Sequence, residues 1–273
     1  MSSVVTKLWN TYHGKNNVRP AVERQLKDLG LTYFDLYLIH FPVPCEFTPI
    51  AEAYPPPGWI KPGKEKFEYE RSPIQDTWRE IEKLVDDGLA RNIGISNFNV
   101  QTILDMLTYC RIKPSILQSK WYIREWKSLY TDWLFRSCTI VEHHPYLQQP
   151  RLVDWVKKQG IHIMAYSSFG PISYNEMTAT GKNTPTLFDN ETIKSIAAKH
   201  DKTPGQVLLR WSTQRDIVVI PKSLNAGRMA ANLGVFGWSL DEEDLKAIGT
   251  LNAGLRFNDT MEPAYGIDLP IFD

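Results

Sequence analysis

Six short apolar runs divide the chain, and each ends on a polar or ionisable residue. They occupy residues 4–7, 36–40, 93–97, 116–118, 163–166 and 218–222. Continuous hydrophobic runs are typical of parallel strands that are buried on both faces. In a parallel β/α barrel the functional side chains gather at the C-terminal ends of such strands. The pattern therefore predicts six parallel strands whose polar last residues share one rim.

Amphipathic helical segments lie between these runs. Apolar residues recur every three or four positions within 18–29, 78–85, 100–107, 152–156, 193–197 and 207–211. The pair Thr203-Pro204 stands at the cap and first-turn positions of the last of these helices. Alternating strands and helices indicate a parallel sheet within a single domain over residues 1–273. A closed barrel of this type has eight strands, so the pattern is two strands short.

The stretch 42–73 differs from the rest because it is rich in proline and has no periodicity. Loops of this length inside a compact domain are usually functional. We expect a loop on the catalytic rim that shapes a substrate pocket. A solvated surface excursion is the alternative.

The spacing of the strands identifies an anomalous segment, 119–140. Residues 91 and 115 are 24 positions apart, which suits one β/α unit, whereas 115 and 161 are 46 apart. Removing the 22 residues of 119–140 restores an interval of 24. The spacing of Tyr122, Trp126, Leu129 and Trp133 would form an amphipathic helix for a partner or a lipid surface. A translated intron is the other interpretation, because the codons for Ser119-Lys120 can contain a fungal-type splice donor.

The composition excludes several classes of function. The 31 basic and 31 acidic residues cancel, so no net field attracts nucleic acid or an anionic membrane. Three cysteines without metal-ligand spacing suit a reducing compartment. The N-terminus lacks a secretory signal, and no apolar run approaches the roughly 20 residues that span a bilayer. We expect a cytoplasmic protein without a membrane or nucleic-acid partner.

Several motifs, in order along the chain, resemble the aldo-keto reductases, and among them most closely the fungal D-xylose reductases. The motifs are VTKLWN at 5–10, DLYLIHFP at 35–42, GISNF at 94–98, VEHHPYLQQP at 141–150, AYSSFGP at 165–171, IPKS at 220–223 and GLRFND at 254–259. The resemblance implies a TIM-type (β/α)8 barrel that here lacks its first two β/α units. It also implies the reduction of an open-chain aldose, as in D-xylose to xylitol, with NADPH bound without a Rossmann motif.

Two catalytic residues follow from this resemblance. Lys7 matches the lysine that lowers the pKa of the family's acid tyrosine, and His40 matches the histidine that orients the carbonyl. The tyrosine itself and the aspartate that pairs with the lysine have no counterpart in these 273 residues. Tyr12 follows Lys7 too closely to replace the tyrosine. We therefore expect little turnover, because general acid catalysis contributes about 10²–10⁴-fold.

The resemblance also implies a cofactor site along the strand ends. Ser96, Asn97 and Gln118 match the residues that hydrogen-bond the nicotinamide carboxamide. Tyr166 matches the aromatic residue that stacks on the nicotinamide ring, and Ser167 matches the pyrophosphate side. The residues that match the family's binding site for the adenosine end and its 2′-phosphate are Lys222, Ser223, Arg228 and Asn232. Leu224 and Ala231 depart from the family pattern, which usually has asparagine and an acidic or amide residue there. Asp189 stands where dual-specificity enzymes carry a glutamate, so NADPH is expected and NADH is the alternative.

Asn258 matches a contact to a substrate hydroxyl, and Trp59 is expected at the rim of the pocket. The adjacent His143 and His144 point apart in regular structure, so we expect no metal site.

We expect a monomer or homodimer acting on a small-molecule aldose. A non-catalytic NADP-binding protein and a non-functional gene-model fragment are the alternatives.

Overall fold

The computed structural model describes residues 4–55, 58–114, 137–261, 265, 267 and 269–272. Its six strands are β1 (Val5–Leu8), β2 (Leu36–Ile39), β3 (Ile93–Ser96), β4 (Ser137–Glu142), β5 (Ile161–Tyr166) and β6 (Ile217–Val219). They follow the order β1-β2-β3-β4-β5-β6 in one sheet, and the pairs β1/β2, β2/β3 and β5/β6 are parallel. The predicted partial barrel of parallel strands is confirmed.

The fourth strand is the one position where the apolar pattern and the described strands differ. The run 116–118 and most of the anomalous segment, 119–136, lie outside the described residues. Residues 137–140, the last four of that segment, form the start of β4. The interpretation of 119–140 as an insert stays a prediction.

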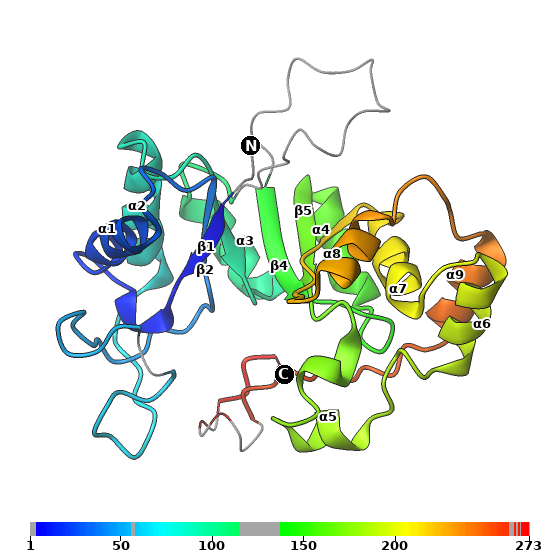
Figure 1. Cartoon of the computed structure of the whole chain (residues 1–273). Helices are drawn as coiled ribbons and strands as arrows, with labels where there is room; N and C mark the ends of the chain where they lie inside the picture. Colours follow the sequence, from blue (N-terminus) through cyan, green and yellow to red (C-terminus); the bar gives the residue numbers. More distant parts are fainter. Residues whose placement is uncertain are drawn as a thin grey trace, which may run out of the picture. The chain divides into compact units, whose positions relative to one another are not determined.

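The chain divides into two compact units. The first contains residues 1–139 and 156–162, and the second contains 140–155 and 163–273. In the first unit, α1 (Val18–Leu29) and α2 (Ile74–Asp86) pack together beside β1 and β2 (Figure 1). The helix α3 (Val100–Tyr109) begins with a capping box of Asn99 and Thr102.

The core of the first unit explains why these segments form strands and helices. All four residues of β2 are fully buried, as a parallel strand covered on both faces requires. The apolar stripe of α2 buries Trp78 and Ile81 completely. Helix α1 ends at Gly30, whose φ of 64° suits a residue without a Cβ. Burial of each large apolar side chain stabilises the fold by about 1.5–3 kcal/mol.

The second unit is built mainly from helices. They are α5 (Ala179–Asn183), α6 (Glu191–Lys199), α7 (Pro204–Thr213), α8 (Ala226–Leu233) and α9 (Glu242–Gly249), and α4 (Pro150–Lys158) carries residues of both units. Helix α6 packs against α7 and α9 (Figure 1). Trp211 and Phe257 lie in the buried cluster of this unit. The predicted cap of α7 is confirmed, because Thr203 and Gln206 form a capping box before Pro204.

The proline-rich stretch 42–73 is a loop, as the sequence predicted, but it is not simply solvated. Its described residues contain no helix, and a single antiparallel bridge joins Cys45 to Tyr69. Cys45, Thr48 and Trp59 are buried. The indole of Trp9 donates a hydrogen bond of 2.9 Å to the carbonyl of Gly58. The loop is therefore packed onto the end of β1.

Candidate active site

In the first unit, three of the predicted site residues meet at neighbouring strand ends. His40 follows β2 directly, Ser96 is the last residue of β3, and Asn97 comes next. The side-chain amide of Asn97 donates to the carbonyl of His40 at 3.0 Å and to Oγ of Ser96 at 3.2 Å. The backbone amide of His40 donates to the carbonyl of Leu8. The parallel register of β1, β2 and β3 thus brings these positions together.

The electrostatics of Lys7 and His40 suit a carbonyl-binding site. Burial, and after it the charge of Lys7, lowers the pKa of His40 to about 3, so its imidazole is neutral at physiological pH. A neutral imidazole keeps one N–H that can donate to a carbonyl oxygen. Burial also lowers the pKa of Lys7. None of the described residues forms a hydrogen bond or an ion pair with its ammonium group.

Two aromatic rings of the first unit pack against His40. The ring of Trp9 lies 5.1 Å from the imidazole and that of Phe41 lies 5.0 Å from it, measured between ring centroids. Trp59 packs edge-on against both, at 5.5 Å from Trp9 and 4.8 Å from Phe41. Trp59 of loop 42–73 therefore packs against the two aromatic rings that contact His40. Its predicted role toward substrate stays a prediction.

Tyr12 does not serve as a replacement acid. Its hydroxyl is buried and has no hydrogen-bond partner among the described residues. Burial of the hydroxyl is the main cause that raises its pKa to about 12. A phenol with a raised pKa is a poorer proton donor than an ordinary tyrosine. The expectation that Tyr12 cannot replace the absent tyrosine agrees with this environment.

In the second unit, Tyr166 and Asn258 meet at the end of β5. The amide Nδ2 of Asn258 donates to the hydroxyl of Tyr166 at 3.0 Å, and its Oδ1 accepts from the hydroxyl of Tyr265 at 2.7 Å. Burial, and after it the charge of Glu142, raises the pKa of Tyr166 well above its usual range. Tyr166 is therefore a neutral ring, which suits stacking rather than proton donation.

Two residues predicted for the cofactor have unusual backbone conformations. Asn97 directly follows β3 with a φ of 61°, and Ser167 directly follows β5 with a φ of 54°. Non-glycine residues with positive φ store strain and cluster at functional sites. The hydroxyl of Ser167 is hydrogen-bonded to that of Tyr174 at 3.0 Å. The chain thus turns sharply at both strand ends, at the positions that the resemblance assigns to the cofactor.

The cations predicted for the 2′-phosphate lie beyond β6. Lys222 and Arg228 are exposed, and neither forms an ion pair with a described residue. Asn225 caps α8 by accepting from the backbone amide of Arg228 at 2.9 Å, and Ser223 accepts from that of Asn225 at 3.1 Å. A capped helix start with two available cations fits a phosphate group. Asn232 lies on the same helix.

Comparison with known proteins supplies the decisive observation. Residues 2–253 match the model of the aldo/keto reductase family. The chain belongs to this family. It is 52% identical over 270 residues to the 4-dihydromethyl-trisporate dehydrogenase of Mucor mucedo, which covers 99% of this chain and 76% of that protein. It is 47% identical over 270 residues to the NAD(P)H-dependent D-xylose reductase xyl1 of Aspergillus niger, covering 98% and 76%.

Membership makes this chain an NAD(P)H-dependent oxidoreductase, and the described residues fit that cofactor. The available cations Lys222 and Arg228 suit its phosphates, and the neutral ring of Tyr166 suits its nicotinamide. Gln118, the remaining predicted carboxamide contact of this aldo/keto reductase, lies outside the described residues. Lys7 and His40 belong to one unit and Tyr166 to the other, so their convergence stays a prediction.

Sequence reasoning missed one residue of this aldo/keto reductase, Glu142. It ends β4, is fully buried, and accepts hydrogen bonds from the backbone amides of Phe257 and Asn258. His144 also bonds it, at 3.0 Å. The sequence signal for Glu142 is an acidic residue at the end of an apolar run, because a charge that is buried there requires hydrogen-bond partners.

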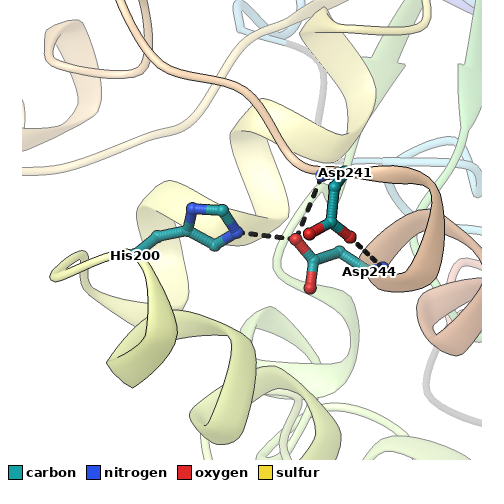
Figure 2. A group of neighbouring side chains, drawn as sticks. All are labelled: His200, Asp241 and Asp244. Carbon is teal, nitrogen blue, oxygen red and sulfur yellow. Dashed lines mark hydrogen bonds and ion pairs between the residues drawn. The ribbon is translucent and has the colours of Figure 1, made fainter.

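A second cluster of ionisable groups lies at the start of α9 (Figure 2). Nε2 of His200 lies 2.6 Å from a carboxylate oxygen of Asp244, and Asp241 and Asp244 accept from each other's backbone amides. The three side chains lie close enough to hold a cation. Lys199, however, forms ion pairs with both carboxylates. The cluster is therefore a capped helix start whose carboxylates are already paired with a lysine.

No described helix has both the length and the apolar character needed to cross a bilayer.

Proposed function

We propose that this aldo/keto reductase reduces the carbonyl of an open-chain aldose of the D-xylose type to the alcohol, with NADPH as the preferred cofactor and NADH as the alternative. The neutral imidazole of His40 beside the desolvated ammonium of Lys7 carries this proposal. We also propose that the 273-residue chain turns over slowly. It acts as a monomer or homodimer in the cytoplasm, and its molecular mass in solution tests the oligomeric part.

The roles of the residues follow from where charge develops. The nicotinamide, when bound, supplies the hydride. The carbonyl oxygen then becomes negative, and groups that are already oriented toward this charge lower the barrier. The N–H of His40 donates to that oxygen, and the positive charge of Lys7 stabilises it. Because no described acid is activated at this site, the proton that completes the alcohol comes from solvent water. Ser96 and Asn97 hold the carboxamide, and the ring of Tyr166 stacks on the nicotinamide.

Slow turnover follows from the surroundings of Lys7. No described phenol or carboxylate bonds its ammonium group, so no described acid is activated by it. A positioned general acid contributes about 10²–10⁴-fold to the rate. We therefore expect NADPH binding with a rate reduced by that factor relative to a relative that has the tyrosine.

The direct experiment measures the oxidation of NADPH by the 273-residue chain with D-xylose. His40→Ala and Lys7→Met should each abolish the residual rate, whereas Lys15→Met should not, because Lys15 is an exposed lysine. Equal rates for wild type and His40→Ala would contradict the proposal. NADPH binding without turnover would favour the non-catalytic NADP-binding alternative. A chain that shows no cooperative unfolding transition would favour the non-functional fragment.

Arg228 provides a separate test of cofactor preference. Replacing it with serine removes a guanidinium that suits a phosphate group. We expect Arg228→Ser to weaken NADPH binding about tenfold, as loss of a hydrogen bond to a charged group does, and to leave NADH binding within about twofold. The ratio of the two dissociation constants is the measurement, because it cancels general effects on folding.

One observation favours a second substrate class, an apolar carbonyl compound. Trp9 and Phe41 pack against His40, Trp59 packs against both of them, and the indole of Trp9 already donates to the carbonyl of Gly58. Aromatic surfaces suit apolar groups better than a polyol. The 52% identical relative is named for a trisporate rather than a sugar. A higher kcat/KM for benzaldehyde than for D-xylose would favour this class, and the reverse order would favour the aldose.

A further inference from the structure

The segment 256–258, which follows α9 without regular secondary structure, is held by a single buried carboxylate. Oε1 of Glu142 accepts from the amide of Phe257 at 2.8 Å, and Oε2 accepts from the amide of Asn258 at 3.0 Å. These groups lie 115 and 116 positions apart in the sequence. Hydrogen bonds to a charged group are about twice as strong as neutral ones. One side chain thus fixes two successive peptide groups.

A closed set of polar contacts supports the buried charge. Nε2 of His144 lies 3.0 Å from Oε1 of Glu142, and the guanidinium of Arg256 lies 3.9 Å from Oε2. Gln149 donates to the backbone carbonyl of Glu142 at 2.7 Å and accepts from Arg256 at 3.2 Å. These partners provide the hydrogen bonds and the opposite charge that a buried carboxylate requires.

The fixed backbone determines where the side chains of the segment lie. The ring of Phe257 is fully buried and stacks on His144, with centroids 5.1 Å apart. The carboxamide of Asn258 is hydrogen-bonded on both sides, by the hydroxyls of Tyr166 and Tyr265. All these residues belong to the second unit. A shift of the backbone at 257–258 would therefore move Asn258 away from Tyr166.

We propose that Glu142 is a positioning residue, which holds segment 256–258 so that Asn258 fixes the hydroxyl of Tyr166. The proposal rests on the proposed function in one respect, since Tyr166 is there the residue that stacks on the nicotinamide. It follows that the affinity for NADPH depends on a carboxylate at the end of β4. The same carboxylate then sets the place of Asn258, the side chain expected to contact a substrate hydroxyl.

Glu142→Gln is the informative variant because it keeps the size of the side chain and removes its charge. We expect faster amide hydrogen exchange in a peptide that spans 255–261, and a dissociation constant for NADPH about tenfold higher. Asn258→Ala should weaken binding similarly. Adding Glu142→Gln to Asn258→Ala should weaken it by less than about twofold more, because residues that act through one contact are not additive.

Asp244→Asn is the matched control within the same unit. Like Glu142, Asp244 is a buried carboxylate that bonds a histidine and a backbone amide. It should speed exchange around the start of α9 and leave the affinity for NADPH within about twofold, the tolerance expected of an independent site. Glu142→Asp keeps the charge and should restore part of both properties. It also replaces Glu142→Gln as the test if that variant fails to fold.

The outcomes separate this inference from the proposed function. A wild-type chain that does not bind NADPH contradicts the proposed function alone. The exchange measurement then decides the role of Glu142, with partial recovery in Glu142→Asp as the second readout. Unchanged exchange at 255–261, no recovery in Glu142→Asp, or additive losses of NADPH affinity overturn the inference.

Discussion

Three ionisable side chains of the first unit lie fully or partly buried, and none forms an ion pair with a described residue. Lys7, His13 and His40 all have a lowered pKa, and burial is the main cause in each case. Lys7 and His40 lie at strand ends where this property serves the proposed chemistry. His13 lies in the loop before α1, and neither nitrogen of its ring has a partner among the described residues. Its burial therefore affects stability rather than catalysis.

We predict that His13 makes the protein sensitive to acid. Its pKa falls from 6.5 in the unfolded chain to about 3 in the folded one. As the pH falls through this window, the unfolded state takes up the proton first, so stability is lost by up to about 1.4 kcal/mol per pH unit. His13→Met should lose less stability between pH 7 and 5 in urea titrations. An identical loss in both proteins would contradict this assignment.

At the scale of elements, the backbone turns after strands and the caps at helix starts determine where the polar residues at the strand ends lie. Asn97 and Ser167 turn the chain with positive φ directly after β3 and β5. The helices α3, α7 and α9 each begin with a capping box, which fixes where the preceding loop stops. The turn at Asn97 and the cap of α3 both follow β3, and together they determine how this strand end leads into its helix.

We predict that the cap of α9 depends on the ionised carboxylate of Asp244. Burial alone would raise its pKa, but the hydrogen bonds from His200 and Lys199 outweigh burial and lower the pKa below 3.8. The stabilisation is therefore present above the unfolded pKa and lost as the pH falls through the folded one. Asp244→Asn should cost about 2 kcal/mol at pH 7 and much less at pH 3. Urea titrations at both pH values measure the difference.

At the scale of the whole molecule, several large apolar side chains of the second unit are exposed on or near β6 and α8. Helix α8 has no buried residue, and its Leu233 is 67% exposed. The other exposed apolar side chains of this region are Val218, Ile220, Leu224, Met229 and Phe236. Large apolar side chains that are exposed to solvent favour association. We expect these side chains to lower solubility whatever the catalytic rate.

We predict that Leu233→Glu reduces aggregation without loss of stability. The side chain is exposed, so the substitution removes apolar surface and disrupts no packing. Light scattering during heating should begin at a higher temperature, with an unchanged midpoint of unfolding by circular dichroism. Leu208→Glu is the contrasting variant, because Leu208 is fully buried and the charge should unfold the domain. Earlier scattering in Leu233→Glu would contradict the prediction.

The sequence by itself determined the elements. Buried parallel strands need apolar side chains on both faces, so β1, β2, β3, β5 and β6 were visible as continuous runs. Amphipathic spacing likewise located the core of α1, α2 and α7. The motifs at the strand ends also indicated the aldo/keto reductase family before any comparison. The described fourth strand, β4, begins inside segment 119–140, which the strand spacing predicts to be an insert, so the pattern did not indicate a strand there.

Only the tertiary structure decided which distant groups share one environment. The lowered pKa of His40 depends on burial and on Lys7, which lies on another strand. The role of Glu142 depends on peptide groups more than a hundred positions away. Local patterns carry the periodicity of side chains, but hydrogen bonding and desolvation depend on distance in space. The sequence therefore determined the strand ends and the family, and the fold decided the charges and contacts that these ends acquire.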